Sequence, residues 1–203
     1  MTGLGSAARR LAVEDIADVR AYERERPAFL AHVIELKRRR RVPVGPFLTV
    51  LFENRDTVRF QIQEMARVER LLSDAAIQTE LDVYNPLIPE PGELSATLFV
   101  ELTSDELLRA WLPRLVGIER ELELRFEDGS SARSMAEEQQ AERLTRDDIT
   151  STVHYVRFEL TPPQMSALVA GLRIVLASTH PSYAEETVLT PETIAELAAD
   201  ATR

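Results

Sequence analysis

The amino-acid sequence predicts an α+β protein in which an N-terminal helical region packs on a mixed, ferredoxin-like-type β-sheet with strand–helix–strand units. Apolar residues recur every three or four positions through most of residues 13–84, the periodicity of half-buried helices. Beyond residue 93 the period changes to two, most clearly in Leu122–Phe126, where apolar and charged residues alternate. We therefore expect a mainly helical region at 1–92 and an α/β sheet region at 93–203, forming one compact unit.

Four helices are expected in the N-terminal region, from their apolar stripes and end signals: Val13–Tyr22, Pro27–Arg41, Arg55–Leu72, and a stretch from Asp74 to just before Pro86. The second places Pro27 at a first helical position, where proline is well tolerated. Asn54 is a suitable N-cap for the third helix. Between the second and third helices, Phe47–Glu53 is predicted to form a short strand.

The C-terminal region contains a local repeat that suggests the sheet topology. The residues VELT at 100–103 and FELT at 158–161 each end a predicted strand, and each Thr is followed three residues later by Glu or Gln, the capping-box pattern of a helix start. A further strand follows each helix, although the second crossover is short for a parallel connection. The predicted strands are Ser95–Leu102, Leu122–Phe126, Thr152–Leu160 and Leu172–Ser178. Met135–Asp148 is predicted as a loop or exposed helix, and a last helix begins at Thr190.

The composition indicates an ordinary soluble protein with an uneven charge distribution. Apolar residues make up 44% and charged residues 29% of the 203 residues, and no apolar stretch is long enough to span a membrane. The N-terminus has no secretory signal, so we expect a cytoplasmic location. Residues 1–41 carry ten Lys/Arg against six Asp/Glu, whereas the rest carries 14 against 28. This acidic body disfavours general nucleic-acid binding.

Several kinds of chemistry are excluded by missing residues. Without cysteine, the chain cannot bind an iron–sulphur cluster through thiolates or use a thiol nucleophile. Only three histidines occur, and none is paired with another at helical spacing, so an HExxH zinc site is absent. We find no Walker loop and no GxSxG nucleophile elbow.

Five adjacent cations end the second predicted helix: Lys37, Arg38, Arg39, Arg40 and Arg41, called the cation run below. A structural interpretation is sufficient, since cations complement a helix C-terminus and can pair with the acidic body. The functional alternative is an anion site or a dock for an acidic partner, because guanidinium groups bind carboxylate and phosphate through two hydrogen bonds.

Two histidines and a tyrosine are weak candidates for a catalytic or metal-binding site. His154 falls on the apolar face of its predicted strand, where a hydrogen-bonded core role is the simpler interpretation. His180 precedes Pro181 at a strand end, a better position for chemistry. If the two strands are neighbours, the rings could converge with Tyr155 or Tyr183 into a small acid–base or metal site. No metal ligand is predicted with confidence from two histidines.

Five segments in this order, ELKRRRRVPVGP, LFENRDTVRFQIQEMARVER, YNPLIP, VHYVRFEL and HPSY, resemble the uncharacterised bacterial family called domain of unknown function 3501. The resemblance runs from about Leu11 to Val188. Relatives often lie beside rubrerythrin and a cysteine-rich iron–sulphur oxidoreductase in genomes, which implies a role near peroxide or redox stress. No catalytic residues are established for the family, so none is transferred. Some relatives have a histidine where Phe47 stands, so a metal or acid–base role at that position is doubtful here.

Together these observations favour a cytoplasmic accessory protein that binds a rubrerythrin-like or iron–sulphur partner through the cation run, without carrying electrons itself. The alternative is a small enzyme that binds a metal or an anionic metabolite in a pocket near His154 and His180. A third possibility is a structural subunit of a homo-oligomer. The sequence identifies no cofactor.

Overall fold

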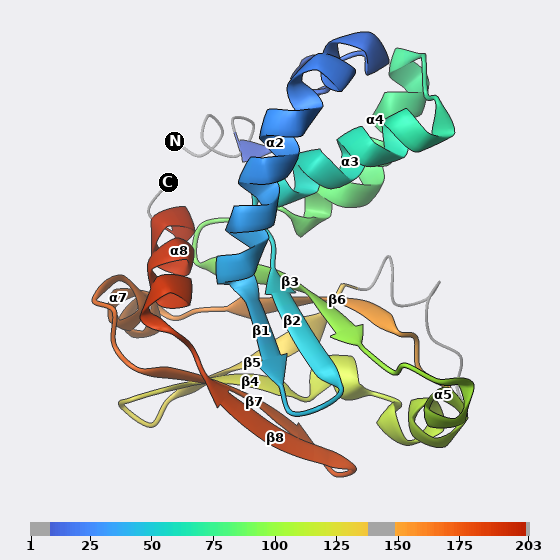
Figure 1. The fold of residues 1–203 in the computed structure, drawn as a ribbon. Helices are drawn as coiled ribbons and strands as arrows, with labels where there is room; N and C mark the ends of the chain where they lie inside the picture. Colours follow the sequence, from blue (N-terminus) through green and yellow to red (C-terminus); the bar gives the residue numbers. More distant parts are fainter. Residues whose placement is uncertain (1–8, 138–148, 202–203) are drawn as a thin grey trace. The chain divides into compact units, whose positions relative to one another are not determined.

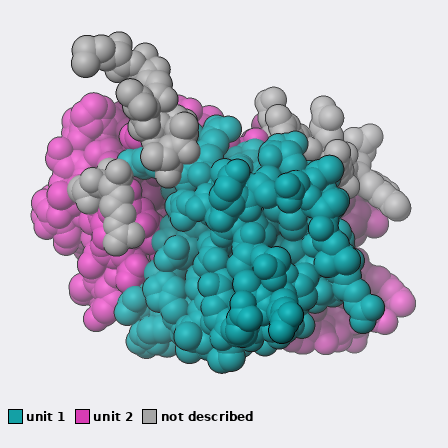
Figure 2. All heavy atoms as spheres, turned by 90° about the horizontal axis from the view of Figure 1, so that it is seen from above, with its two compact units in different colours: residues 1–39, 53–90 teal, residues 40–52, 91–203 magenta. Residues whose placement is uncertain are grey.

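The computed structural model describes residues 9–137 and 149–201. The chain divides into two compact units (Figure 2): residues 1–39 and 53–90 form the helical unit, and residues 40–52 and 91–203 form the sheet unit. The sequence places the change of region after residue 92, close to the last of the three boundaries, which follows residue 90. It does not anticipate that residues 40–52, inside the predicted helical region, belong to the sheet unit.

The helical unit consists of α3 (Arg55–Glu69), α4 (Asp74–Tyr84), most of α2 (Val19–Arg40), and the short 3-10 turns η1 (Val13–Asp15) and η2 (Asn85–Leu87). The first two predicted helices are therefore one long helix preceded by a turn. Pro27 lies inside α2, not at its start. An internal proline removes a helical hydrogen bond, so the burial of Tyr22, Val33 and Leu36 along the same helix must offset that cost.

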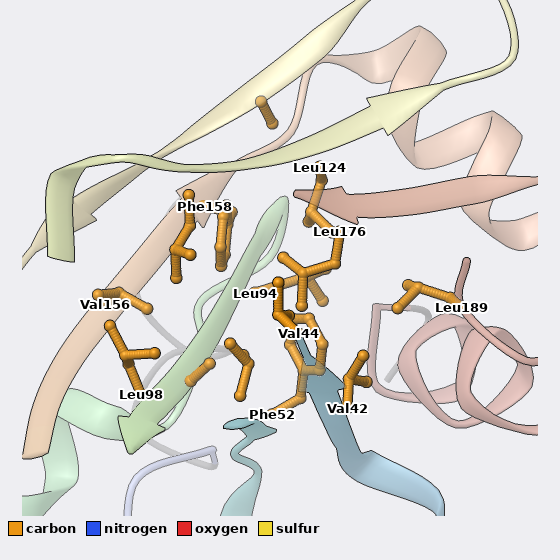
Figure 3. Close-up of a cluster of buried hydrophobic side chains, with 14 of the residues drawn as sticks. Val42, Val44, Phe52, Leu94, Leu98, Leu124, Val156, Phe158, Leu176 and Leu189 are labelled. Carbon is orange, nitrogen blue, oxygen red and sulfur yellow. The ribbon is translucent and has the colours of Figure 1, made fainter. Parts of the chain in front are cut away.

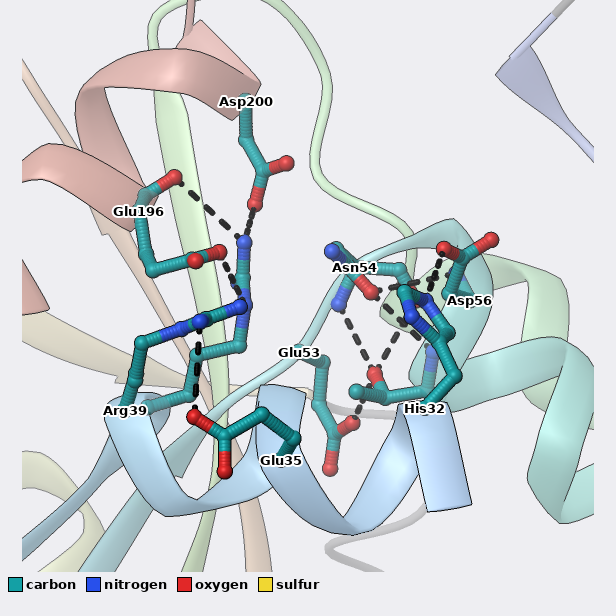
Figure 4. Close-up of polar contacts among 10 residues, drawn as sticks. His32, Glu35, Arg39, Glu53, Asn54, Asp56, Glu196 and Asp200 are labelled. Carbon is teal, nitrogen blue, oxygen red and sulfur yellow. Dashed lines mark hydrogen bonds and ion pairs between the residues drawn. The ribbon is translucent and has the colours of Figure 1, made fainter. Parts of the chain in front are cut away.

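Side-chain caps fix the starts of α3 and α4. Asn54 is the N-cap of α3, as predicted: its Oδ1 accepts hydrogen bonds from the backbone N–H of Asp56 at 3.1 Å and of Thr57 at 3.0 Å (Figure 4). The backbone N–H of Asn54 donates in turn to the Thr57 hydroxyl at 2.9 Å. Ser73 caps α4 by accepting from the Ala76 N–H. These bonds satisfy amides that the first helical turn leaves without partners.

The sheet unit contains one eight-stranded sheet in which every neighbouring pair is antiparallel, in the order β1-β2-β3-β6-β5-β4-β7-β8 (Figure 1). The strands are β1 (Arg41–Val44), β2 (Leu48–Phe52), β3 (Glu93–Val100), β4 (Leu122–Phe126), β5 (Ser131–Ala136), β6 (Val153–Glu159), β7 (Ile174–His180) and β8 (Tyr183–Val188). The sheet curls until it is nearly closed into a barrel.

The predicted ferredoxin-like mixed sheet is wrong. The expected strand–helix–strand units need the two strands joined by a helix to run parallel in a mixed sheet, but every neighbouring pair of this sheet is antiparallel, so β3 and β4, like β6 and β7, run in opposite directions. The sequence correctly predicts a helix after each repeat, but it does not indicate which strands pair with each other. The short second crossover is consistent with this outcome, because α7 (Pro162–Val169) links strands that do not run parallel.

The two edge strands, β1 and β8, are joined by side chains. The Tyr183 hydroxyl donates to the Val44 carbonyl and accepts from the Phe47 N–H, both at 2.8 Å, and the Thr187 hydroxyl donates to the Pro43 carbonyl. Gly45 lies in this seam with a φ of +65°, and a Cβ there would stand 2.6 Å from the Tyr183 oxygen. Only glycine therefore fits this closure.

The interior of the sheet unit is an apolar core formed by alternate residues of the strands (Figure 3). Its members include Val42, Val44, Phe52, Leu94, Leu98, Leu124, Val156, Phe158, Leu176 and Leu189. The helices α5 (Asp105–Trp111), α7 and α8 (Pro191–Ala201) lie mostly outside the barrel, with the turns η3 (Leu112–Leu115) and η4 (Ile118–Arg120) after α5. In the described part of the chain, none of the helices could cross a lipid bilayer.

The helix starts after the two sequence repeats differ in detail. In the second copy, the Thr161 N–H donates to Gln164 Oε1 at 2.9 Å, half of the predicted capping box. In the first copy, the cap is Ser104, whose hydroxyl accepts from the Leu107 N–H, and not the predicted Thr103. The predicted loop at Met135–Asp148 begins with the last two residues of β5, and residues 138–148 lie outside the described part.

Candidate ligand site at Glu119 and His154

Two buried ionisable side chains meet in the sheet unit. The turn η4 provides Glu119, and β6 provides His154, whose alternating pattern directs it to the buried face with Val156 and Phe158. Only 6% of Glu119 and 2% of His154 are exposed. The buried hydroxyl of Ser134 fixes η4, because it donates to the Glu119 carbonyl at 2.9 Å and accepts from the Leu122 N–H at 3.0 Å.

The hydrogen bonds of His154 fix which ring nitrogen carries the proton. Nε2 lies 2.9 Å from the Ser151 carbonyl and 2.9 Å from the Thr150 hydroxyl. A carbonyl oxygen can only accept, so Nε2 must be protonated to make the first bond. In the neutral ring, the other nitrogen, Nδ1, is then an acceptor. Thr150 and Ser151 lie just before β6, so the segment that leads into the strand of His154 also determines which ring nitrogen is protonated.

The acceptor Nδ1 of His154 faces a second acceptor. It lies 4.0 Å from Oε2 of Glu119, which is too far for a hydrogen bond. Oε2 is fully buried and accepts no hydrogen bond from any residue that the structure describes. The other carboxylate oxygen, Oε1, lies 3.7 Å from Nε of Arg120, a side chain that is 62% exposed. The Glu119 carboxylate is thus incompletely compensated inside the protein.

Burial lowers the pKa of His154 below its usual value, and the nearby Glu119 carboxylate and the Ser151 carbonyl oppose that effect. The imidazole is consequently neutral near pH 7, and its acceptor Nδ1 lies 4.0 Å from the Glu119 carboxylate. Two acceptors that face each other repel unless a proton or a donor group lies between them. The pair can therefore bind a proton, a cation or a hydrogen-bond donor, and the neutral imidazole can act as a base.

Metal binding by side chains of the described residues alone is not supported. No group of three or more His, Asp or Glu side chains that could hold a metal ion occurs among residues 9–137 and 149–201. Glu119 and His154 would supply only two ligands, fewer than the three or four protein ligands of typical zinc sites.

His180 does not join this site. Its Nε2 donates to the Val116 carbonyl at 3.1 Å, and its Nδ1 accepts from the Ser182 N–H at 3.2 Å. Both nitrogens are thus used to hold a turn of the backbone. Tyr155 follows His154 directly in β6, so its side chain lies on the opposite face of the strand. The Tyr183 hydroxyl binds the Val44 carbonyl and the Phe47 N–H between β1 and β8. The predicted convergence of these residues on His154 is therefore not seen in the described contacts.

The first half of the cation run lies in the helical unit and contacts neighbouring side chains. Arg38 donates to both carboxylate oxygens of Glu35, at 2.8 and 3.1 Å. Arg39 contacts the same carboxylate at 3.4 Å (Figure 4). The Lys37 ammonium lies 5.4 Å from the centre of the Phe60 ring. These contacts fit a solvated helix end, although 71% of the Arg38 side chain remains exposed.

The second half of the cation run lies in the sheet unit. Arg40 is fully buried and pairs with Asp200 and Glu196 of α8, and its Nη2 also donates to the Glu196 carbonyl (Figure 4). Arg41 pairs with Glu101 at 3.1 Å. All four arginines of the run thus have carboxylate partners within the molecule. The structural interpretation accounts for Arg40, whose guanidinium is inaccessible to a partner.

The segment that resembles the family most specifically, residues 51–70, has structural roles in the helical unit. Gln63 of α3 accepts from the Ala17 N–H at 3.0 Å and donates to the Ala17 carbonyl at 2.8 Å. Arg59 donates to the Asp15 carbonyl at 2.8 Å. Polar residues of α3 therefore hold the chain before α2 in place.

Sequence reasoning missed Glu119 and Thr150 as site residues. Glu119 lies in a charged stretch, GIERELELRF, and this pattern predicts that its charged side chains are exposed. Its burial arises because Ser134, fifteen positions later, anchors η4 against the barrel. One signal was available: His154 falls on an apolar face, and a buried imidazole needs polar partners. That signal predicts a partner but does not say which residue supplies it.

The protein is thus an α+β protein whose sheet unit has a nearly closed eight-stranded antiparallel barrel and a buried Glu–His pair. A family model described as "Protein of unknown function (DUF3501)" matches residues 10–201, so the chain belongs to this family, which confirms the resemblance. A solved structure, a novel protein of unknown function from Burkholderia pseudomallei K96243, is 38% identical with a TM-score of 0.86, and the match covers 94% of this chain and 98% of that one. No curated protein matches.

Proposed function

We propose that this protein binds a small molecule at Glu119 and His154 and that His154 acts as an acid–base group toward it. One observation carries the proposal: the buried Oε2 of Glu119 has no hydrogen-bond partner among the described residues and faces the acceptor nitrogen of His154. Leaving a buried acceptor unpaired costs about 1–3 kcal/mol. Such a cost is commonly retained at functional sites, where a ligand completes the arrangement.

The hydrogen bonds of the site support a role in binding and acid–base chemistry. The Ser151 carbonyl holds the proton on Nε2 of His154, which leaves Nδ1 free to accept a proton from a bound molecule. The Glu119 carboxylate would stabilise the imidazolium that results, as acidic neighbours of catalytic histidines do. His180, predicted as a second member of the site, is not part of this proposal because both of its ring nitrogens bind the backbone.

The electrostatic coupling of the pair gives a direct test. In a Glu119→Gln variant, we expect the pKa of His154 to fall below its wild-type value, because the carboxylate that opposes the effect of burial is gone. NMR titration of the ring 15N signals measures this. Glu123→Gln is the matched control, since Glu123 is a partly buried carboxylate of the same unit that pairs with Arg125 and Arg133. An identical His154 titration in all three proteins would contradict the proposal.

The redox-linked accessory role, which the family resemblance implies, stays a separate prediction. If the cation run binds a partner, Arg38 and Arg41 are its most exposed members, whereas Arg40 is buried. Charge reversal at those two positions, followed by co-purification of tagged protein at low salt, tests it: a rubrerythrin-like or iron–sulphur partner should be retained by the wild type and lost by the variant.

A further inference from the structure

We infer that the ligand of this site presents a protonated nitrogen with at least two N–H groups, as a primary amine or an ammonium ion does, and that it binds between Oε2 of Glu119 and Nδ1 of His154. This inference rests on the proposed function and adds the chemical class of the ligand. Three properties of the pair lead to it: the separation of Oε2 and Nδ1, the missing hydrogen-bond donor at Oε2, and the charge of the carboxylate.

The separation of the two acceptor atoms favours a hydrogen-bonded nitrogen over a metal ion. The atoms are 4.0 Å apart. A nitrogen about 2.85 Å from each would form an angle of about 90° with them, near the angle between two N–H bonds. A metal ion about 2.1 Å from each would need an angle of about 145°, far from tetrahedral geometry. The pair is thus spaced for a donor that bridges two hydrogen bonds.

Both facing atoms are acceptors, so the ligand must supply both hydrogens. The Ser151 carbonyl keeps the ring proton on Nε2 of His154, and the lowered pKa keeps the ring neutral. The Glu119 carboxylate has no proton to give when it is ionised. A ligand with a single N–H or O–H would satisfy one acceptor and leave the other unpaired. Two N–H groups on one nitrogen satisfy both.

The charge of the site selects a cation over a neutral donor such as an alcohol. Glu119 is 94% buried by residue area, since only 6% is exposed, and its nearest cation among the described residues is the largely exposed Arg120. A buried carboxylate whose counter-charge is carried by one largely exposed side chain is still costly, and a neutral donor would add no positive charge. An ammonium group supplies the hydrogens and the positive charge together.

The test compares two monovalent cations that differ in N–H groups. Wild-type protein, Glu119→Gln and the control Glu123→Gln are titrated with methylammonium chloride and, at matched ionic strength, with tetramethylammonium chloride. The measurements are the ring 15N shifts of His154 and the melting temperature. We expect methylammonium to shift the Nδ1 signal saturably and raise the melting temperature in wild type and control, and to bind at least about tenfold more weakly to Glu119→Gln. Tetramethylammonium, which has no N–H, should do neither.

The outcomes separate this inference from the function on which it rests. An equal response to both cations, or a response that survives in Glu119→Gln, would overturn the amine assignment. If neither cation affects His154 but its titration still depends on Glu119, the amine assignment fails and the acid–base site stands. If the titration is also independent of Glu119, both fail.

Discussion

Replacing Arg40 with methionine should lower the free energy of unfolding of the sheet unit by about 3–5 kcal/mol, because removal of one partner leaves a buried charge uncompensated. Arg40 is fully buried, and its guanidinium pairs with Asp200 and Glu196 of α8. Asp200 is itself only 14% exposed in its side chain, so it would lose its counter-charge without gaining water. The substitution should therefore weaken the attachment of α8 to the rest of the sheet unit.

Urea unfolding followed by tryptophan fluorescence measures this effect in the right part of the molecule, since the single tryptophan, Trp111, lies in the sheet unit. Arg38→Met is the matched control: the same substitution two positions earlier removes an exposed pair with Glu35, and about 0–1 kcal/mol is expected. A double variant, Arg40→Met with Asp200→Leu, should recover part of the loss. Equal stabilities of the two single variants would contradict the assignment of Arg40 as a structural residue.

The second large effect is an acid-dependent loss of stability that originates at Glu64 in the helical unit. Its carboxylate accepts hydrogen bonds from Arg26 at 2.8 and 3.2 Å, from Arg67 at 3.0 and 3.3 Å, and from the Tyr22 hydroxyl at 2.7 Å. The Arg26 hydrogen bonds contribute most to lowering the pKa of Glu64 from 4.5 to about 2, and burial opposes them. Such a network favours the ionised form strongly.

The sign of the pH dependence follows from the lowered pKa. The stabilisation by Glu64 is complete above pH 4.5 and is lost as the pH falls through about 2, because only the unfolded chain binds the proton readily between those values. The full effect is on the order of 3 kcal/mol. We expect Glu64→Gln to be less stable than wild type at pH 7 and the difference to shrink toward pH 2, as followed by circular dichroism in urea.

Glu35→Gln provides the comparison, since Glu35 also pairs with two arginines of the helical unit but is half exposed. Its effect should be much smaller than that of Glu64→Gln, because solvent screens an exposed ion pair. A difference between Glu64→Gln and wild type that remains constant from pH 7 to pH 2 would show that the network does not stabilise the ionised carboxylate.

The local structure could be predicted where one short stretch decides it. Asn54 caps α3 as its side chain predicts, and the alternation in Leu122–Phe126 forms β4. The strands β1 and β8 could not be predicted from periodicity, because β1 is only four residues long and begins at the last residue of the cation run, and β8 is largely exposed. The barrel depends on which strands pair, and the Tyr183 hydroxyl that joins β8 to Val44 acts across 139 residues. No local pattern reveals such a pairing.

The candidate site was only half predictable for the same reason. His154 stands out because an imidazole on an apolar strand face needs partners, and Thr150 and Ser151, four and three residues earlier, provide two of them. Glu119 lies near the ring because Ser134, which is distant in sequence, holds the η4 turn in place through a hydrogen bond. His180 looked equally promising in the sequence, but the Val116 carbonyl and the Ser182 N–H occupy its nitrogens.

If Glu119 serves a ligand, its buried carboxylate should destabilise the protein when no ligand is bound. The most direct test is the free energy of unfolding of Glu119→Gln without ligand, measured in urea by Trp111 fluorescence. The amide carries no charge to bury and presents a donor, not a second acceptor, toward Nδ1 of His154, so the variant should be more stable than wild type by about 1–3 kcal/mol. A variant less stable than wild type would show that the carboxylate is a structural group and would contradict the account.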